Sequence, residues 1–229
     1  MTLLKRLAIV VVVVAALAGI ADRCLWWLAQ DYAASALAER GATNPRVQIH
    51  GFPFLTQVAT HTLDDVEIDA DELHLDETGN LQRLHMRAHD VDLDYANGTV
   101  RTIGSLTATG RLPLATIADS ANKSADGKGT VRVDGDRLVA SIPTAIGTLR
   151  ADVGFTRHDP VDNKPTIGLT LSNFHSDNPL VAALTHGFST PAIPVPLTKA
   201  PAGLDLTGVT KDGDGLLVNV TGHNLTVAR

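Results

Sequence analysis

The spacing of hydrophobic residues changes twice along this chain. Residues 7–20 form an uncharged, aliphatic run. Residues 22–40 carry apolar side chains at helical spacing, and beyond Val47 apolar and polar residues alternate as they do in half-buried strands. The pattern predicts an apolar segment, a helix and then a long β-rich region.

The predicted helix spans residues 22–40. Leu25, Leu28, Tyr32 and Ala36 fall near one stripe, which we expect to face the sheet, and Gly41 follows as a C-cap.

The alternation in the β-rich region slips by one residue at two places. Val66, Ile68 and Ala70 alternate before the phase shifts to Leu73, and the spacing shifts again after Ala88. A phase slip within a strand pattern is typical of a β-bulge, and bulges bend strands. We therefore expect a strongly curved antiparallel sheet. Further alternating segments lie at residues 105–112, 130–133, 138–142, 149–155, 166–171, 204–209 and 216–220. Short helices are predicted at residues 113–122 and 179–186.

The apolar run follows Lys5 and Arg6, as in a secretory signal. Its 14 residues would extend about 21 Å as a helix, less than the roughly 30 Å of a hydrocarbon core. Cleavage after Ala21 and retention as an anchor, with Trp26 and Trp27 at the membrane interface, both remain open. We expect residues 1–21 to be a signal peptide or anchor and residues 22–229 to be one exported domain at the periplasmic face of the plasma membrane.

The amino-acid composition narrows the classes of function that the protein can have. The 229 residues are 44% hydrophobic but only 4% aromatic, so any cavity would be lined by aliphatic side chains. The net charge of −6 argues against a nucleic-acid partner, which requires clustered Lys and Arg. The single cysteine, Cys24, is expected to be a small buried hydrophobe and excludes an intrachain disulfide.

No motif predicts catalysis, a cofactor or a metal. His85 and His89 lie four apart on a predicted strand, about 13 Å along its axis, too far to share a metal ion. Asp90, Asp92 and Asp94 lack the turn and distal Glu of a calcium loop. No Gly-x-Ser-x-Gly or phosphate-binding loop is present.

The remaining candidate function is the binding of aliphatic chains. A groove between the curved sheet and the helix of residues 22–40 would stabilise an acyl chain by about 0.8 kcal/mol per buried CH₂. The same alternation would also produce a filled β core. Phe52, Phe54 and Leu55 either seal one end of the core, or contact a membrane or line the mouth of a cavity. The predicted lipid-binding residues are Leu25, Leu28, Phe52, Phe54, Leu55, Val66, Ile68, Val91 and Leu93.

A resemblance favours the lipid interpretation. The segment Gly-Phe-Pro-Phe-Leu-Thr-Gln at residues 51–57 resembles the signature of the actinobacterial LmeA-like phospholipid-binding family. The pair Asp22-Arg23, near the start of the predicted helix, also resembles this family. Residues 193–197 and 201–209 resemble its C-terminal part. The resemblance implies an envelope protein that binds phospholipids, including phosphoinositides, and supports lipoglycan maturation. It also implies a helix wrapped by a curved antiparallel sheet, similar to tubular lipid-binding domains, and no catalytic residues.

We therefore predict an α+β fold in which a long N-terminal helix packs in a strongly curved antiparallel sheet. The protein would be a monomeric, non-enzymatic lipid-binding protein with a membrane surface as partner. The alternatives are an envelope scaffold with a filled interior and, less favoured, an enzyme acting on lipoglycans.

Overall fold

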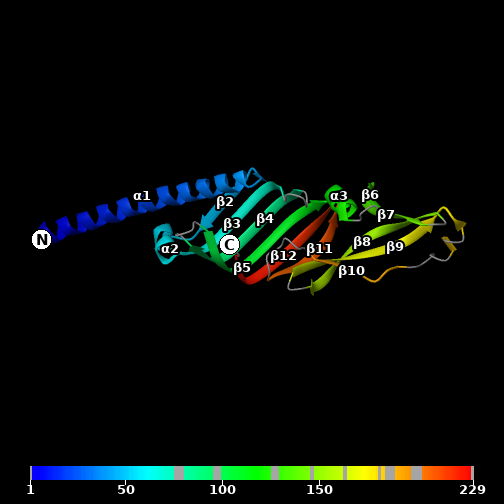
Figure 1. The fold of residues 1–229 in the computed structure, drawn as a ribbon. Helices are drawn as coiled ribbons and strands as arrows, with labels where there is room; N and C mark the ends of the chain where they lie inside the picture. Colours follow the sequence, from blue (N-terminus) through cyan, green and yellow to red (C-terminus); the bar gives the residue numbers. More distant parts are fainter. Residues whose placement is uncertain are drawn as a thin grey trace.

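The computed structural model describes residues 2–74, 80–94, 99–124, 129–144, 147–161, 164–179, 182–183, 189–196 and 203–227. Figure 1 shows an elongated molecule with a long helix projecting at one end. The helices are α1 (Thr2–Glu39), α2 (Phe54–Thr60) and α3 (Leu114–Ser124). The first group of strands is β1 (Ala42–Thr43), β2 (Arg46–His50), β3 (Thr62–His74), β4 (Asn80–Asp94), β5 (Thr99–Pro113), β11 (Leu204–Asp212) and β12 (Gly215–Thr226). The second group is β6 (Thr130–Asp134), β7 (Arg137–Thr144), β8 (Gly147–Val161), β9 (Lys164–Ser176) and β10 (Ile193–Pro196).

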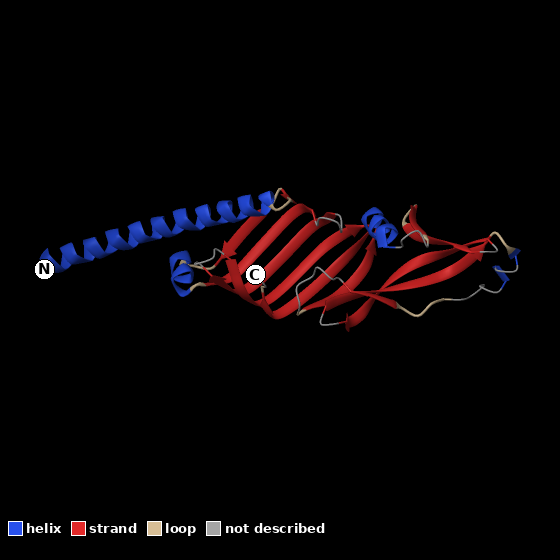
Figure 2. Cartoon of the chain, in the orientation of Figure 1, coloured by secondary structure: helices blue, strands red, loops and turns tan. Residues whose placement is uncertain are grey.

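The strands form two antiparallel sheets, arranged end to end in Figure 2. The seven-stranded sheet has the order β1-β3-β4-β5-β12-β11, with β2 also paired to β3. The five-stranded sheet has the order β10-β9-β8-β7-β6. The predicted class is confirmed: α+β, with one long N-terminal helix and a strongly curved, unclosed sheet. The sequence did not reveal the division into two sheets.

Helix α1 is longer than predicted and faces the sheet with other residues. It runs unbroken from Thr2 to Glu39, because Asp22 and Arg23 interrupt the apolar run without ending a helix. The expected stripe was wrong: Leu25, Leu28 and Tyr32 are exposed. The α1 side chains that pack against the core are instead the small residues Ala29, Ala33 and Ala34, together with Trp26 and Leu37. The C-cap is confirmed, since Gly41 has a φ of 93° and its N–H donates to the Ala38 carbonyl.

The phase slip after Ala88 falls where the backbone departs from regular strand geometry, whereas β3, which carries the slip after Ala70, has no residue of positive φ. Asp90, between the buried Ala88 and Val91, has a φ of 55°, and Arg83 on the same strand has a φ of 49°. The register of β4 against β5 shifts between Gln82 and His85. Gly104 allows the close approach beside Asp90, since a Cβ at this position would lie 2.8 Å from the Asp90 Cβ.

Helix α3 connects the two sheets. Its buried residues Leu114 and Ala118 form one cluster with Leu138 of the second sheet and Leu216 of the first. The helix predicted at residues 113–122 is therefore confirmed. Of the helix predicted at residues 179–186, only residues 179, 182 and 183 are described, and they are helical.

Candidate lipid-binding surface

One face of the seven-stranded sheet is continuously apolar, because strand register aligns aliphatic residues, together with one glycine, across six strands. One row consists of Val47, Ile68, Met86, Ala108, Val220 and Leu206. The adjacent row consists of Ile49, Val66, Ala88, Leu106, Gly222 and Leu204. At about 4.8 Å between strands, each row extends about 24 Å. We call this surface the aliphatic face.

Two helices pack against this side of the sheet, and the middle of the second row, at Val66, Ala88 and Leu106, is buried. Trp26 and Leu37 of α1 pack over the end near β2, whereas α3 packs over the end near Leu216. Between them, Ile68, Met86, Ala108 and Val220 are only half-buried. Half-buried aliphatic residues between two covered ends leave apolar surface that a guest chain can bury.

A separate cavity of about 160 Å³ lies where α3 meets both sheets. Its apolar lining includes Leu138, Val153 and Phe155, and charged residues line it as well, among them Arg137 and Lys211. Ligand pockets commonly measure about 300–1,000 Å³. This cavity therefore has room for only a short part of a lipid chain.

The joint between α1 and α2 is built from the two motifs that carry the family resemblance. The Leu55 N–H donates to Asp22 Oδ1 at 2.7 Å, so a buried carboxylate of α1 caps the start of α2. The Arg23 guanidinium lies 5.2 Å from the Trp26 ring centroid and 5.3 Å from that of Phe52. These contacts hold the start of α2 against α1.

The rest of the 51–57 segment is hydrogen-bonded to β2 and β3 or packed in the core. Buried Gln57 donates from Nε2 to the His50 carbonyl at 3.2 Å and accepts at Oε1 from the Asp64 N–H at 3.0 Å. Gly51 has a φ of 102°, and a Cβ there would lie 2.4 Å from Gln57 Nε2, so glycine is required. Phe54 is buried in the core.

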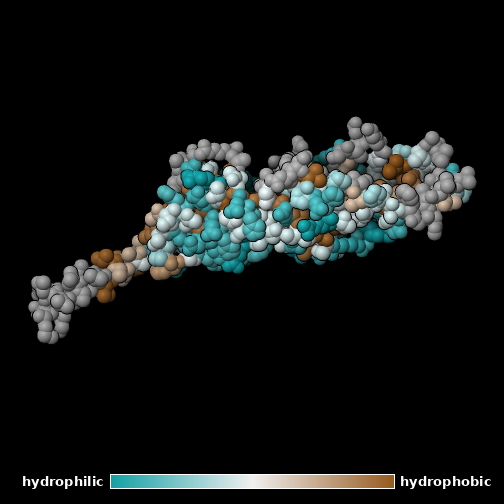
Figure 3. All heavy atoms as spheres, turned by 90° about the horizontal axis from the view of Figure 1, so that it is seen from below, coloured by the Kyte–Doolittle hydropathy of each residue, from teal (hydrophilic) through white to brown (hydrophobic). Residues whose placement is uncertain are grey.

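Exposed apolar side chains gather where α1 leaves the body. Phe52 is 66% exposed and Trp27 63%, and Leu55 is exposed beside them on α2. Helix α1 is long and apolar enough over Val12–Glu39 to cross a membrane, by length and composition. Figure 3 shows hydrophobic residues on its projecting part, whereas the visible face of the body is mostly hydrophilic. The apolar N-terminal helix is consistent with a signal peptide or an anchor and thus suggests export.

The structure places the predicted lipid-binding residues in three settings. Val66, Ile68, Val91 and Leu93 belong to or pack against the core cluster of the aliphatic face, as does Phe54. Phe52 and Leu55 are exposed at the α1–α2 joint. Leu25 and Leu28 are exposed on α1, as is Cys24, which was expected to be buried. These positions do not themselves show contact with a lipid, so the assignment of the nine residues to lipid binding remains a prediction.

The sequence analysis missed several residues of this surface. Asp22 and Gln57 act on backbone groups through contacts that no local pattern indicates. Met86, Ala108 and Val220 carried the right alternation but could be joined into a row only once the strand order was known.

The opposite face of the sheet is polar. Among the described residues, its Glu67, Asp69 and His85 form a group that could hold a metal ion. On the second sheet, an open polar hollow of about 600 Å³ is lined by residues that include Arg132, Arg150 and His175.

A curved sheet with an uninterrupted aliphatic face, attached to an apolar helix, defines a class of protein suited to hold lipids. The profile of the family described as LmeA-like phospholipid-binding matches residues 20–221, and the chain belongs to this family. Family membership supports lipid binding and agrees with a non-enzymatic role. Comparisons with curated proteins and with solved structures give no match.

Proposed function

We propose that this chain is an exported, membrane-proximal protein that holds phospholipid acyl chains against the aliphatic face of its seven-stranded sheet. The observation that carries the proposal is the cross-strand row from Val47 to Leu206, whose middle residues, such as Met86 and Ala108, are only half-buried beside the buried second row. A chain of about 16 carbons buried there would contribute on the order of 10 kcal/mol before ordering costs.

The N-terminal helix supports a location beside a membrane. Lys5 and Arg6 precede the apolar segment, which by the positive-inside tendency leaves the body on the exported side. The uncharged residues 7–20 extend about 21 Å as a helix, so flanking residues would complete an anchored span of about 30 Å, the thickness of a hydrocarbon core. The exposed Trp27 and Phe52 would then lie near the membrane surface, where aromatic side chains are enriched.

The resemblance extends the proposal to its biological setting. Phosphoinositides are the candidate ligands that it implies, and envelope lipoglycan maturation is the process that the protein would support as a monomer. The competing scaffold would keep the same fold but bind no lipid.

Native mass spectrometry of the full chain after gentle detergent purification tests the proposal with two adjacent substitutions on β5. We expect wild-type protein to retain phospholipid and Ala108→Asp to lose most of it, because Ala108 is half-buried on the aliphatic face. Thr107→Asp is the matched control, because Thr107 is exposed on the opposite face. Circular dichroism establishes that both variants fold.

Absence of phospholipid from the wild-type protein would favour the scaffold. Equal retention by the folded Ala108→Asp and Thr107→Asp variants would contradict the assignment of the aliphatic face.

A further inference from the structure

The polar face of β3 and β4 carries acidic and basic side chains in register. Three acidic residues of β3 lie directly across from three basic residues of β4, in the pairs Asp65–His89, Glu67–Arg87 and Asp69–His85. Because these side chains alternate with those of the aliphatic face, they lie on the other side of the sheet. None of them is used by the proposed lipid site.

One acid of this set has a permanent cation. Arg87 binds Asp65 through two nitrogens, Nε at 2.9 Å and Nη2 at 2.6 Å. This bidentate hydrogen bonding lowers the pKa of the Asp65 carboxyl. The positive charge of Arg87 therefore offsets the negative charge of the Asp65 carboxylate.

The other two acids are paired differently. Within the described part of the chain, the ion-pair partners of Glu67 and Asp69 are histidines. His85 Nδ1 lies 2.8 Å from Asp69 Oδ1 and 3.9 Å from Glu67 Oε1, and His50 Nε2 lies 3.3 Å from Glu67 Oε2. Unlike Asp65, neither acid has an arginine hydrogen-bonded to it among the residues that the structure describes.

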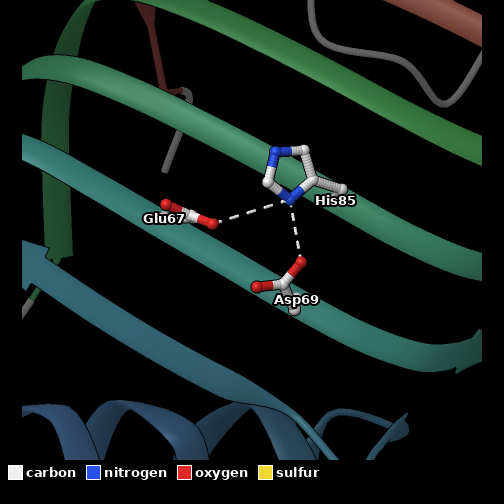
Figure 4. Close-up of side chains that lie close together, drawn as sticks. All are labelled: Glu67, Asp69 and His85. Carbon is white, nitrogen blue, oxygen red and sulfur yellow. Dashed lines mark hydrogen bonds and ion pairs between the residues drawn. The ribbon is translucent and has the colours of Figure 1, made fainter.

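The three side chains converge on one point. Figure 4 shows Glu67 and Asp69 projecting from one strand toward the His85 ring on the next. One ligand atom from each residue lies within 4.8 Å of the other two. Tetrahedral zinc ligands at about 2.0–2.1 Å from the metal are about 3.3 Å apart, so small side-chain rotations would bring these atoms into place.

We propose that Glu67, Asp69 and His85 bind one Zn²⁺ ion on the polar face of the sheet. One imidazole nitrogen and two carboxylate oxygens are donors that zinc accepts, whereas calcium and magnesium prefer oxygen alone. Neighbouring strands in fixed register supply all three ligands. His85 is exposed and the two acids are half-buried, so the fourth coordination position faces solvent.

His50 has a supporting part in this site. It contacts Glu67 Oε2, whereas the oxygen near His85 is Oε1. A partner on the second carboxylate oxygen orients a metal ligand without touching the metal.

The test is zinc titration of the full chain, purified without a polyhistidine tag, in competition with a chromogenic chelator. We expect one Zn²⁺ per wild-type chain. His85→Ala and the near-isosteric Asp69→Asn should weaken binding by more than about tenfold, and His50→Ala by about tenfold. His89→Ala is the matched control, because His89 lies on the same strand and face but against Asp65.

Three results would overturn the proposal. They are no zinc binding by wild-type protein, equal affinity in His85→Ala and wild type, and a loss in His89→Ala as large as in His85→Ala. Exposed Cys24 is present in every variant, so it cannot produce the predicted difference between them. Circular dichroism and phospholipid retention should be unchanged in His85→Ala, which separates this site from the lipid-binding proposal.

Discussion

At the residue scale, Asp22 illustrates how a single side chain joins distant segments. Its side chain is buried, one oxygen accepts the Leu55 N–H, and the other oxygen has no hydrogen-bond partner within the described structure. Burying a carboxylate costs free energy that the bond to the start of α2 offsets. Asp22 thus fixes α2, and with it the exposed Phe52, against the helix that leaves the body.

We predict that Asp22→Ala lowers the free energy of unfolding by about 1 kcal/mol, the usual cost of a lost helix cap. Thermal unfolding of the full chain in detergent, followed by circular dichroism, measures this change. Asp31→Ala is the control, because Asp31 lies exposed on the same helix. An unchanged transition in Asp22→Ala would show that the cap contributes nothing.

Residue roles were the least predictable part of this site. The hydrophobic character of Phe52 and Phe54 was evident, but only the fold shows that Phe54 is buried and Phe52 exposed. The contact between Asp22 and Leu55 spans 33 residues, and no local rule connects them. His85 was considered against His89 on its own strand, whereas the structure pairs it with Asp69 across the sheet.

At the element scale, the curvature of the sheet was predictable because alternation is a local signal. Ala88 and Val91 are both buried although three positions apart, and Asp90 between them adopts a positive φ. Which side of α1 packs against the sheet was not predictable from the apolar stripe of the helix. Small residues such as Ala29 and Ala33 allow the helix to approach the sheet closely, and they carry a weaker hydrophobic signal than Leu25 and Leu28.

Gly104 provides a test of the bend at Asp90. We predict that Gly104→Ala lowers the free energy of unfolding by about 1–3 kcal/mol, because its Cβ would overlap Asp90 and force the strands apart. Urea unfolding measures the change. Thr107→Ala, on the exposed face of the same strand, should cost less than about 1 kcal/mol. Equal costs at the two positions would show that the close approach is not required.

At the scale of the whole molecule, apolar surface occurs in two places that a lipid-handling protein would use. Helix α1 projects from one end of the body in Figure 1, and the aliphatic face begins beside its base at Val47 and Ile49. The second sheet lies at the far end, beyond α3. The alternating segments correspond to most of the described strands, but β1 and β10 were not predicted. The division into two sheets depends on pairings between segments distant in sequence, such as β5 with β12.

The most direct measurement is photo-crosslinking with a phospholipid that carries a diazirine in its acyl chain, followed by peptide mapping of the full chain. The account predicts adducts on β3, β4, β5 and β12, at aliphatic-face positions such as Ile68, Met86 and Val220. Adducts confined to α1, or to the polar face of the sheet, would contradict it.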